Sequence, residues 1–330
     1  MICPICKKKS YFLQNIEWYI KWNFYDIYKC KECLCHHINM EDISKESYEE
    51  IYSAWNSVIW YDRYRDYAKS IWKQKDALQW LASAEDTYLP IYSFFKKNKN
   101  KNLKVLEIWC WLWYLTHSIN QTWNKCIWVD LSKEAINNAK KFFPDGEYHV
   151  WDVFANKDIL KDNLFDVIVA TELIEHIDDY EKFFSSCNRY LKKWGTVILT
   201  TPNKWYYRKD AIRIWDLPPV HTVRFSYDTF QKIWEIYDFD IATYNYSLNS
   251  KSSNLLFAKF YNNFILKSIL SQPHQISYTQ DIVLKKNKII SYINFFQKLF
   301  IIRKISNMLC YTFYGNKWSH FTLWIYLTKK

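Results

Sequence analysis

The middle of the chain alternates between short, mostly apolar runs and longer amphipathic stretches. The short runs predict strands at residues 104–108, 125–129, 148–150, 165–170 and 195–200. Helical spacing of apolar positions predicts helices between them, at residues 115–121, 132–142 and 179–191. A further helix and strand are expected in SYDTFQKIWEIY and DFDIATYNY, and a last strand in FTLWIYLT. Strands that alternate with helices in this way indicate a parallel sheet wrapped by helices, so we expect an α/β fold.

The pattern changes along the chain and predicts three regions. Residues 1–40 are rich in cysteine, residues 41–100 form a polar-aromatic helical connector, and residues 101–330 form the main domain. Within the main domain, an apolar-aromatic insertion with a helical pattern covers about residues 250–317, with Pro273 as its main break. We interpret this insertion as a substrate lid that also packs into the core, or as a segment that contacts a membrane surface.

Two pairs of cysteines mark the first region. Cys3 and Cys6 form one C-x-x-C motif, Cys30 and Cys33 form a second, and the 23 residues between them alternate like a hairpin. Four thiolates at this spacing can close a tetrahedral structural zinc site, which predicts a zinc ribbon. The alternative is a set of free thiols. The nearby residues are interpreted as surface positions, although they could also bind a metal: Cys35, His36 and His37.

Charge and apolar content suggest the compartment and the partners. We find no signal peptide and no uninterrupted apolar run of spanning length, so we expect a cytoplasmic protein, with peripheral membrane contact as an alternative. The nine cysteines are then thiols in a reducing compartment, free or bound to metal. The net charge of +11 is compatible with nucleic acid or an anionic membrane as a partner. Coding rich in A and T enriches lysine and explains the same charge.

The content of glycine and tryptophan is abnormal for a folded chain. There are 3 Gly and 18 Trp among 330 residues, whereas ordinary usage of about 7% would give roughly 23 glycines. Several tryptophans stand where a turn requires glycine, next to or between strands: Trp128, Trp151, Trp194 and Trp318. We hypothesise that UGA codons read as glycine in the source organism were translated here as tryptophan.

The same substitution affects the most informative motif, VLEIWCWLWYLT at residues 105–116. With glycine in place of Trp109, Trp111 and Trp113, it reads VLEIGCGLG, a strand followed by an acid and alternating glycines. Such a turn bends sharply and lets a ligand approach the backbone with no Cβ in the way. Downstream, an acid ends the next strand at Asp130, and the segments FDVIVATELIEHIDD and LKKWGTVILTTPN follow in order.

Together these segments resemble the class I S-adenosylmethionine-dependent methyltransferases over about residues 101–247 and the last strand. The resemblance implies a Rossmann-like, seven-stranded methyltransferase sheet with helices on both faces, preceded here by the small zinc ribbon. It implies S-adenosylmethionine as cofactor, with Asp130 on the ribose hydroxyls and Asp152 near the adenine. The cofactor-binding residues that it implies are Glu107, Trp109, Cys110, Trp111, Trp113, Asp130, Leu131, Asp152, Val153 and Thr171.

A cluster of acids and histidines follows the fourth predicted strand of the main domain. Glu172, Glu175 and His176 are spaced i, i+3 and i+4, which would place them on one face of a helical turn. With His221 as a fourth ligand, they suit a divalent ion such as Mg²⁺ or Mn²⁺. The pattern resembles ubiquinone-pathway O-methyltransferases and small-RNA 2′-O-methyltransferases, which implies a metal that holds the acceptor hydroxyls. The catalytic residues expected are His176 and Glu172; as an alternative without metal, His176 acts as general base or caps a helix.

Three functions remain compatible with the sequence. The first is O-methylation of a small-molecule, lipid or glycan acceptor. The second is methylation of RNA held by the ribbon and the basic surface. The third is a non-catalytic, zinc-binding interaction protein, which follows if Trp109 and Trp111 are genuine and fill the cofactor site.

Overall fold

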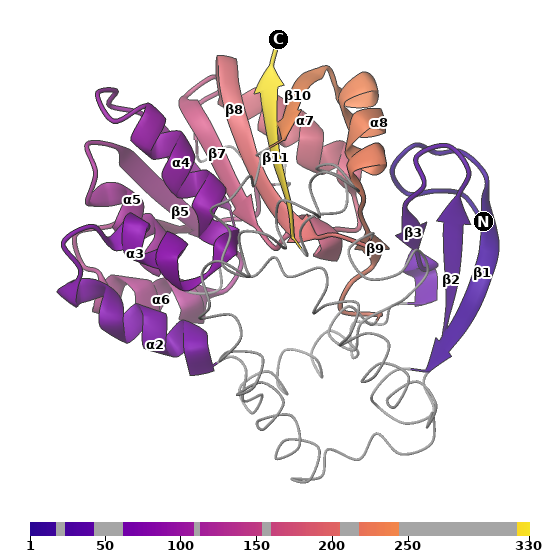
Figure 1. The fold of residues 1–330 in the computed structure, drawn as a ribbon, viewed down its shortest axis with the longest axis horizontal. Helices are drawn as coiled ribbons and strands as arrows, with labels where there is room; N and C mark the ends of the chain where they lie inside the picture. Colours follow the sequence, from indigo (N-terminus) through magenta and orange to yellow (C-terminus); the bar gives the residue numbers. More distant parts are fainter. Residues whose placement is uncertain (18–23, 43–61, 109–112, 154–159, 205–217, 244–321) are drawn as a thin grey trace, which may run out of the picture.

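The computed structural model describes residues 1–17, 24–42, 62–108, 113–153, 160–204, 218–243 and 322–330 (Figure 1). Several sequence-based predictions lie outside these residues. They are the insertion at about 250–317, the turn residues Trp109, Cys110 and Trp111, and the turn at Trp318.

A seven-stranded sheet forms the centre of the main domain, with strand order β10-β11-β8-β7-β4-β5-β6 (Figure 1). The strands are β4 (Lys104–Ile108), β5 (Lys125–Asp130), β6 (Glu147–Val150), β7 (Phe165–Thr171), β8 (Leu191–Pro202), β10 (Phe239–Thr243) and β11 (Thr322–Lys329). The five strands from β6 to β8 pair in parallel, whereas β11 runs antiparallel to both β8 and β10. The predicted α/β class and Rossmann-like sheet are confirmed.

Helices cover both faces of this sheet. They are α2 (Asp62–Ser70), α3 (Ala77–Ala84), α4 (Leu89–Lys97), α5 (Tyr114–Asn120), α6 (Lys133–Phe142), α7 (Tyr180–Tyr190) and α8 (Tyr227–Tyr237). One cluster of buried side chains joins α3, α4, α5 and α6 to the sheet, and a second joins α7 and α8 to it. Neighbouring strand residues such as Val105 and Leu106 belong to opposite clusters. Because both faces are buried, the strands read as nearly continuous apolar runs.

Short polar side chains cap the start of four described helices. Asp76, Ser132, Asp179 and Ser226 each accept a hydrogen bond from the backbone N–H three residues later. These N-caps satisfy donors that a helix start leaves unpaired. Four 3₁₀ turns complete the described helical structure: η1 (Met40–Asp42), η4 (Ile71–Lys73), η5 (Asp86–Tyr88) and η6 (Ile174–His176).

A second, smaller sheet joins the cysteine-rich region to the main domain. Its order is β1-β2-β3-β9, with β1 (Ser10–Glu17), β2 (Phe24–Cys30), β3 (His36–His37) and β9 (Val223–Arg224). The hairpin expected between the cysteine pairs is formed by β1 and β2. Strand β9 comes from the main domain and pairs with β3 in antiparallel fashion, so that His36 lies opposite Arg224 (Figure 1). The two regions therefore share one sheet.

The prediction that Cys35, His36 and His37 are surface residues is wrong. Their exposed fractions are 0%, 0% and 2%. The ring of His37 bonds Ser10 Oγ at 2.8 Å through Nε2, and burial lowers its pKa. The cause is the β3–β9 pairing, which covers this segment with residues almost 190 positions away in sequence.

Among the described helices, none combines the length and the apolar character that a membrane-spanning segment requires.

Candidate functional site

Five parallel strands, from β6 to β8, end at one edge of the large sheet. Strand β4 lies between β5 and β7. Along the sequence, β5 and β6 are added on one side of β4, and β7 and β8 are then added on its other side. In open α/β sheets, ligands bind outside the carboxyl ends of the strands at such a switch point. The predicted residues gather there: Asp130 and Thr171 end β5 and β7, Asp152 follows β6, and Glu107 precedes the last residue of β4.

Asp130 is a buried carboxylate at this edge, with an exposed fraction of 4%. Its Oδ1 accepts a hydrogen bond from the Ser132 N–H at 2.8 Å. Burial raises the pKa of Asp130 to about 6, although bonds from the backbone N–H groups of Ser132 and Leu131 oppose the shift. The neighbouring Leu131 side chain is 54% exposed. The group is thus charged at neutral pH and can accept further hydrogen bonds.

The other predicted cofactor residues have different surroundings. Glu107 is buried and accepts a hydrogen bond from the Thr116 hydroxyl on α5, which links the first strand to the helix after the turn. Val153 and Thr171 are also buried. Trp113, just before α5, stacks on Phe142 with ring centroids 5.5 Å apart. The remaining turn residues lie outside the described part of the chain.

Three of the four predicted metal ligands come together. One ligand atom each from Glu175, His176 and His221 lies within 4.8 Å of the others. His176 Nδ1 lies 2.6 Å from the carbonyl oxygen of Val220. Because a carbonyl oxygen can only accept, Nδ1 carries the proton and Nε2 keeps its lone pair. Burial and the neighbouring His221 lower the pKa of His176 to about 3, so its ring is neutral at physiological pH.

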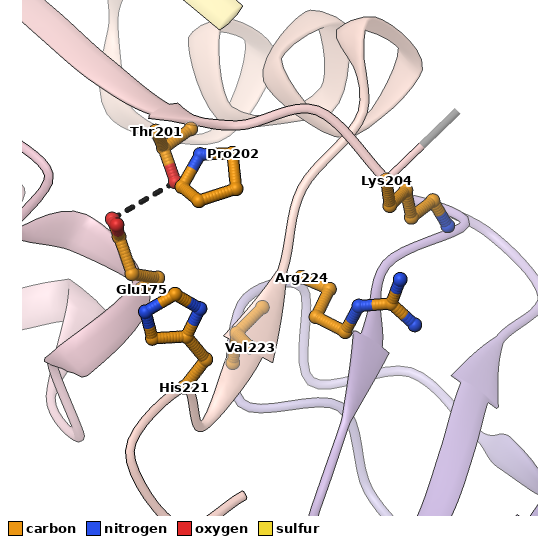
Figure 2. Close-up of a pocket in the computed structure, with 7 residues that line it drawn as sticks. All are labelled: Glu175, Thr201, Pro202, Lys204, His221, Val223 and Arg224. Carbon is orange, nitrogen blue, oxygen red and sulfur yellow. Dashed lines mark hydrogen bonds between the residues drawn. The ribbon is translucent and has the colours of Figure 1, made fainter. Parts of the chain in front are cut away.

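Glu175 is held in place by the end of β8. Its Oε2 accepts a hydrogen bond of 2.9 Å from the Thr201 hydroxyl, and the residue is 1% exposed (Figure 2). The Thr222 N–H and hydroxyl both bond the Glu175 carbonyl, at 2.9 and 3.1 Å, and so tie η6 to the segment that carries His221. Two separate parts of the chain are therefore fixed at one point.

Glu172 is placed differently from its three companions. The 3₁₀ turn begins only at Ile174, and Glu172 precedes it with a positive φ of 48°. Its N–H bonds the Thr200 carbonyl at 2.9 Å, which continues the β7–β8 pairing. The helical turn that the spacing predicts for all three residues therefore does not include Glu172. It is absent from the three-residue group, as judged over the described residues.

A small pocket opens beside this group (Figure 2). Its lining residues are Glu175, Thr201, Pro202, Lys204, His221, Val223 and Arg224. Sequence reasoning missed Lys204 and Arg224. Burial lowers the pKa of Lys204 to about 7, with Arg224 adding to this shift and Cys35 opposing it. The position of Lys204 directly after a predicted strand was a weak sequence signal that it lies near the site. The sequence around Arg224 gave no such signal.

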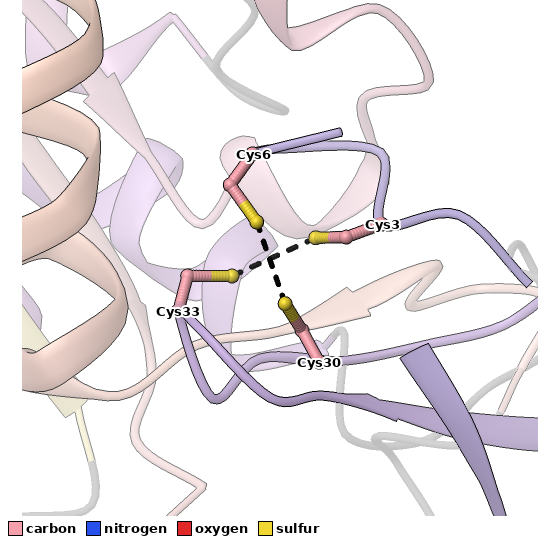
Figure 3. A group of neighbouring side chains, drawn as sticks. All are labelled: Cys3, Cys6, Cys30 and Cys33. Atoms are coloured by element: carbon pink, nitrogen blue, oxygen red, sulfur yellow. Dashed lines mark hydrogen bonds between the residues drawn. The ribbon is translucent and has the colours of Figure 1, made fainter. Parts of the chain in front are cut away.

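The cysteines of the two C-x-x-C motifs converge on one point (Figure 3). Cys3 Sγ lies 3.6 Å from Cys33 Sγ, and Cys6 Sγ lies 3.4 Å from Cys30 Sγ. A tetrahedral zinc ion with Zn–S bonds of about 2.3 Å separates its sulfurs by roughly 3.8 Å, so the four thiols fit it closely. A left-handed residue follows each motif, with φ values of 55° at Lys7 and 60° at Leu34.

A fifth thiol lies next to this cluster. Cys35 Sγ is 3.5 Å from Cys3 Sγ and the residue is fully buried. Burial raises its pKa well above that of an ordinary thiol. Cys35 therefore favours the neutral form beside the four ligand positions.

Curated relatives match parts of this chain. The mitochondrial ubiquinone biosynthesis O-methyltransferase of Bos taurus is 32% identical over 108 residues, which are 31% of this chain and 29% of that protein. The Rattus norvegicus enzyme of the same name is 25% identical over 177 residues, covering 48% and 51%. The Pelagibacter ubique ubiquinone biosynthesis O-methyltransferase is 31% identical, covering 34% and 47%. The chain thus spans about half or less of the length of these relatives.

Solved structures with a similar arrangement share little sequence with this chain. Haemonchus contortus phosphoethanolamine N-methyltransferase 2, in complex with S-adenosyl-L-methionine, gives a TM-score of 0.43 at 17% identity, covering 72% of this chain and 51% of that one. The YcgJ protein of Bacillus gives 0.39 at 15% identity, covering 72% and 97%. The family described as "Methyltransferase domain" matches residues 80–244, which are half of the chain and include the predicted site. On this match, the chain belongs to the methyltransferase domain family.

Proposed function

We propose that this methyltransferase transfers the methyl group of S-adenosylmethionine to a hydroxyl oxygen of a small-molecule, lipid or glycan acceptor. The observation that carries the proposal is the group formed by Glu175, His176 and His221 next to the carboxyl edge of the sheet. The partial match to ubiquinone biosynthesis O-methyltransferases supports oxygen as the atom that receives the methyl group.

The cofactor would lie across the ends of β4, β5 and β6. The Asp130 carboxylate, at the end of β5, would accept hydrogen bonds from the ribose hydroxyls, as in other sheets of this kind. The turn after β4 would pass close to the methionine part of the cofactor. That turn requires residues without a Cβ, so the proposal includes glycine at 109, 111 and 113 in the natural protein.

Other tryptophans support this recoding. Trp194 has a φ of 65° and a side chain that is 65% exposed, as expected where glycine belongs in a turn. The indole N–H groups of Trp113 and Trp128 are buried and have no hydrogen-bond partner among the described residues. A buried, unsatisfied donor typically costs roughly 1–3 kcal/mol. Glycine at these positions would remove both costs.

The three-residue group suits a divalent cation such as Mg²⁺ or Mn²⁺. A carboxylate and two imidazoles are an adequate donor set, and His176 Nε2 is free of the proton that Nδ1 holds. When bound, such an ion lowers the pKa of an acceptor hydroxyl and so eases its attack on the methyl group. A pKa of about 3 makes His176 a weak proton acceptor, which favours the metal-ligand role over general base. Glu172, expected from the sequence as a catalytic and metal-binding residue, lies outside this three-residue group and stays a prediction.

The four thiols of the ribbon would hold a structural zinc ion. The sulfur separations, the deep burial of Cys3, Cys30 and Cys33 and the paired left-handed turns support this role. Closed four-thiolate sites stabilise small domains whose apolar core is limited.

Methylation of RNA is a second candidate, favoured by exposed rings on the ribbon. Tyr11, Phe12 and Phe24 are 40%, 55% and 55% exposed on β1 and β2. The Lys31 Nζ lies 5.9 Å from the centre of the Tyr11 ring. Exposed rings beside lysines can stack on the bases of single-stranded RNA.

The proposed function is tested with the chain carrying Trp109→Gly, Trp111→Gly and Trp113→Gly, called here the glycine-turn variant. Calorimetry is expected to detect S-adenosylmethionine binding to this variant but none to the tryptophan-bearing chain, because three indole side chains leave the cofactor no close approach to the backbone of the turn. With methyl-labelled cofactor and Mg²⁺, label should appear in catechol, a probe with two adjacent hydroxyls. Label in a short single-stranded RNA instead would favour the second candidate, and absence of cofactor binding would favour the non-catalytic role.

If Glu175 binds a divalent ion, its substitution should affect metal binding but not cofactor binding. In the glycine-turn variant, Glu175→Gln should keep S-adenosylmethionine binding but lose Mn²⁺ binding, measured by electron paramagnetic resonance. Methyl transfer should fall by about 10- to 100-fold. Glu181→Gln, on the exposed start of α7, is the matched control and should change neither. Equal loss of cofactor binding in Glu175→Gln would mean that Glu175 is structural.

Cofactor affinity is expected to depend on pH through Asp130. Because burial raises its pKa from 3.8 to about 6, the carboxylate is protonated as the pH falls below about 6 and accepts ribose hydroxyls poorly. Affinity of the glycine-turn variant should therefore fall between about pH 7 and about pH 5. Asp130→Asn should bind more weakly at neutral pH and lose this dependence. The folded state binds the proton more tightly, so this group's contribution to the stability of the folded state decreases as the pH rises from about 4 to about 6 and stays low above that.

Native mass spectrometry is expected to find one zinc ion per chain. Cys30→Ser should lose the ion and lower the melting temperature, because the β2–β3–β9 pairing surrounds the cluster. Cys187→Ser, a buried cysteine of α7 outside the cluster, should keep it. If the unmodified chain contains no zinc and Cys30→Ser leaves the melting temperature unchanged, the four cysteines are free thiols.

A further inference from the structure

Five thiols, not four, are gathered at the proposed zinc site of the ribbon. Four of them converge in Figure 3, those of Cys3, Cys6, Cys30 and Cys33. The fifth belongs to Cys35, whose Sγ lies 3.5 Å from Cys3 Sγ. The Cys35 thiol also interacts with the thiol of Cys33. Cys35 is therefore in contact with two of the four proposed ligands.

The spacing of this fifth thiol suits the same metal. Sulfurs around a tetrahedral zinc ion are roughly 3.8 Å apart, because each Zn–S bond is about 2.3 Å long. The 3.5 Å between the sulfurs of Cys3 and Cys35 matches this value about as well as the 3.6 Å between those of Cys3 and Cys33. A small displacement of an ion bound to Cys3 and Cys33 would therefore bring it within bonding distance of Cys35.

The backbone holds Cys35 on the same turn as the second pair of cysteines. The Cys30 N–H donates a hydrogen bond of 3.0 Å to the Cys35 carbonyl, which closes the turn between β2 and β3. Within this turn, Leu34 has a left-handed φ of 60° between Cys33 and Cys35. The turn thus supplies three thiols to the cluster, whereas the N-terminal turn supplies two.

Cys6 differs from the other proposed ligands in its exposure. Cys3, Cys30 and Cys33 have exposed fractions of 0%, as does Cys35, whereas Cys6 is partly exposed. A competing ligand or a thiol reagent in water therefore reaches Cys6 first. The ligand that is lost most easily thus lies in the same cluster as a buried thiol that is not needed for the first four-sulfur site.

We propose that Cys35 is a reserve zinc ligand, a thiol that replaces Cys6 around the ion when Cys6 leaves it or is modified. In the intact chain, the bond from zinc to Cys6 Sγ breaks and a bond from zinc to Cys35 Sγ forms. The proton of the Cys35 thiol passes through solvent to the released Cys6 sulfur, so the charge of the whole site is unchanged. This inference rests on the zinc site of the proposed function.

The exchange would preserve the junction between the ribbon and the main domain. Strand β3 follows Cys35 directly and pairs with β9 of the main domain. An ion held by Cys3, Cys30, Cys33 and Cys35 would keep the turn before β3 closed. Modification of the exposed Cys6 would then leave the β3–β9 pairing in place.

The test compares Cys6→Ser, Cys35→Ser and the double variant in the full-length chain. Native mass spectrometry gives the zinc content, and competition with a chelator gives the affinity. Each single variant should keep one zinc ion with an affinity within about 10-fold of the unmodified chain, because four thiolates remain. The double variant should bind zinc on the order of 100-fold more weakly, since a structural site divides its binding free energy among four ligands.

X-ray absorption at the zinc edge gives a readout that a mere packing role for Cys35 would not produce. Cys6→Ser should show four sulfurs at about 2.3 Å from zinc. Three sulfurs with one oxygen at about 2.0–2.2 Å would mean that Cys35 does not enter the site, and would overturn the proposal.

Two further variants serve as controls. Cys187→Ser removes a buried thiol of α7 outside the cluster, so zinc affinity and the absorption spectrum should not change. Cys30→Ser should still lose the ion, because a hydroxyl buried at the end of β2 weakens the hairpin in addition to removing a ligand. If Cys6→Ser does not fold, Cys6→Ala takes its place. Failure of both to bind zinc, while Cys187→Ser binds it, would mean that Cys35 cannot replace Cys6.

The same measurements distinguish failure of the reserve ligand from failure of the zinc site. A zinc ion in the unmodified chain but none in the Cys6 variants would remove the reserve ligand alone and leave the four-cysteine site. Absence of zinc from the unmodified chain would contradict both.

Discussion

The parallel pairing of β4 with β5 and with β7 is the constraint on which the site depends. Because these strands end at one edge, residues separated by more than 40 positions meet there, among them Asp130 and Thr171. The residues that follow β4 begin at the same edge, because β4 ends there. A cofactor can use that edge only if the turn lets it approach the backbone. The three tryptophans at 109, 111 and 113 conflict with this requirement more than any other feature of the sequence.

The ribbon belongs to the same arrangement through a different contact. Strand β9 pairs with β3 on one side, while Thr222, next to it, bonds the backbone of Glu175 on the other. His221 therefore sits between a thiol cluster and the end of the sheet. Loss of the proposed zinc ion would be transmitted to the pocket through the β3–β9 pairing and through the Lys204–Leu34 hydrogen bond. Cys35, His36 and Lys204 are buried at this junction, and their pKa shifts reflect removal from water.

Much of the fold could be predicted because its strands are buried on both faces. Strand 104–108 has the predicted limits, and the limits of α6 differ by one residue, since Ser132 caps it. Glu172 was misplaced because spacing alone does not reveal where a helical turn begins. The burial of His36 could not be predicted from the neighbouring sequence, because it arises from a strand pairing across almost 190 positions. Sequence therefore predicts repeating elements better than contacts between distant short strands.

The central claim is that the natural protein has a glycine turn after β4 and hence a usable cofactor site. The most direct test is a peptide mass spectrum of the protein isolated from its source organism, covering residues 105–125. Glycine masses at 109, 111, 113 and 123 are predicted. They would mean that the turn after β4 lacks bulky side chains and that the cofactor can approach its backbone. Tryptophan masses at 109, 111 and 113 would contradict the claim, because the side chains would fill the space that the cofactor needs.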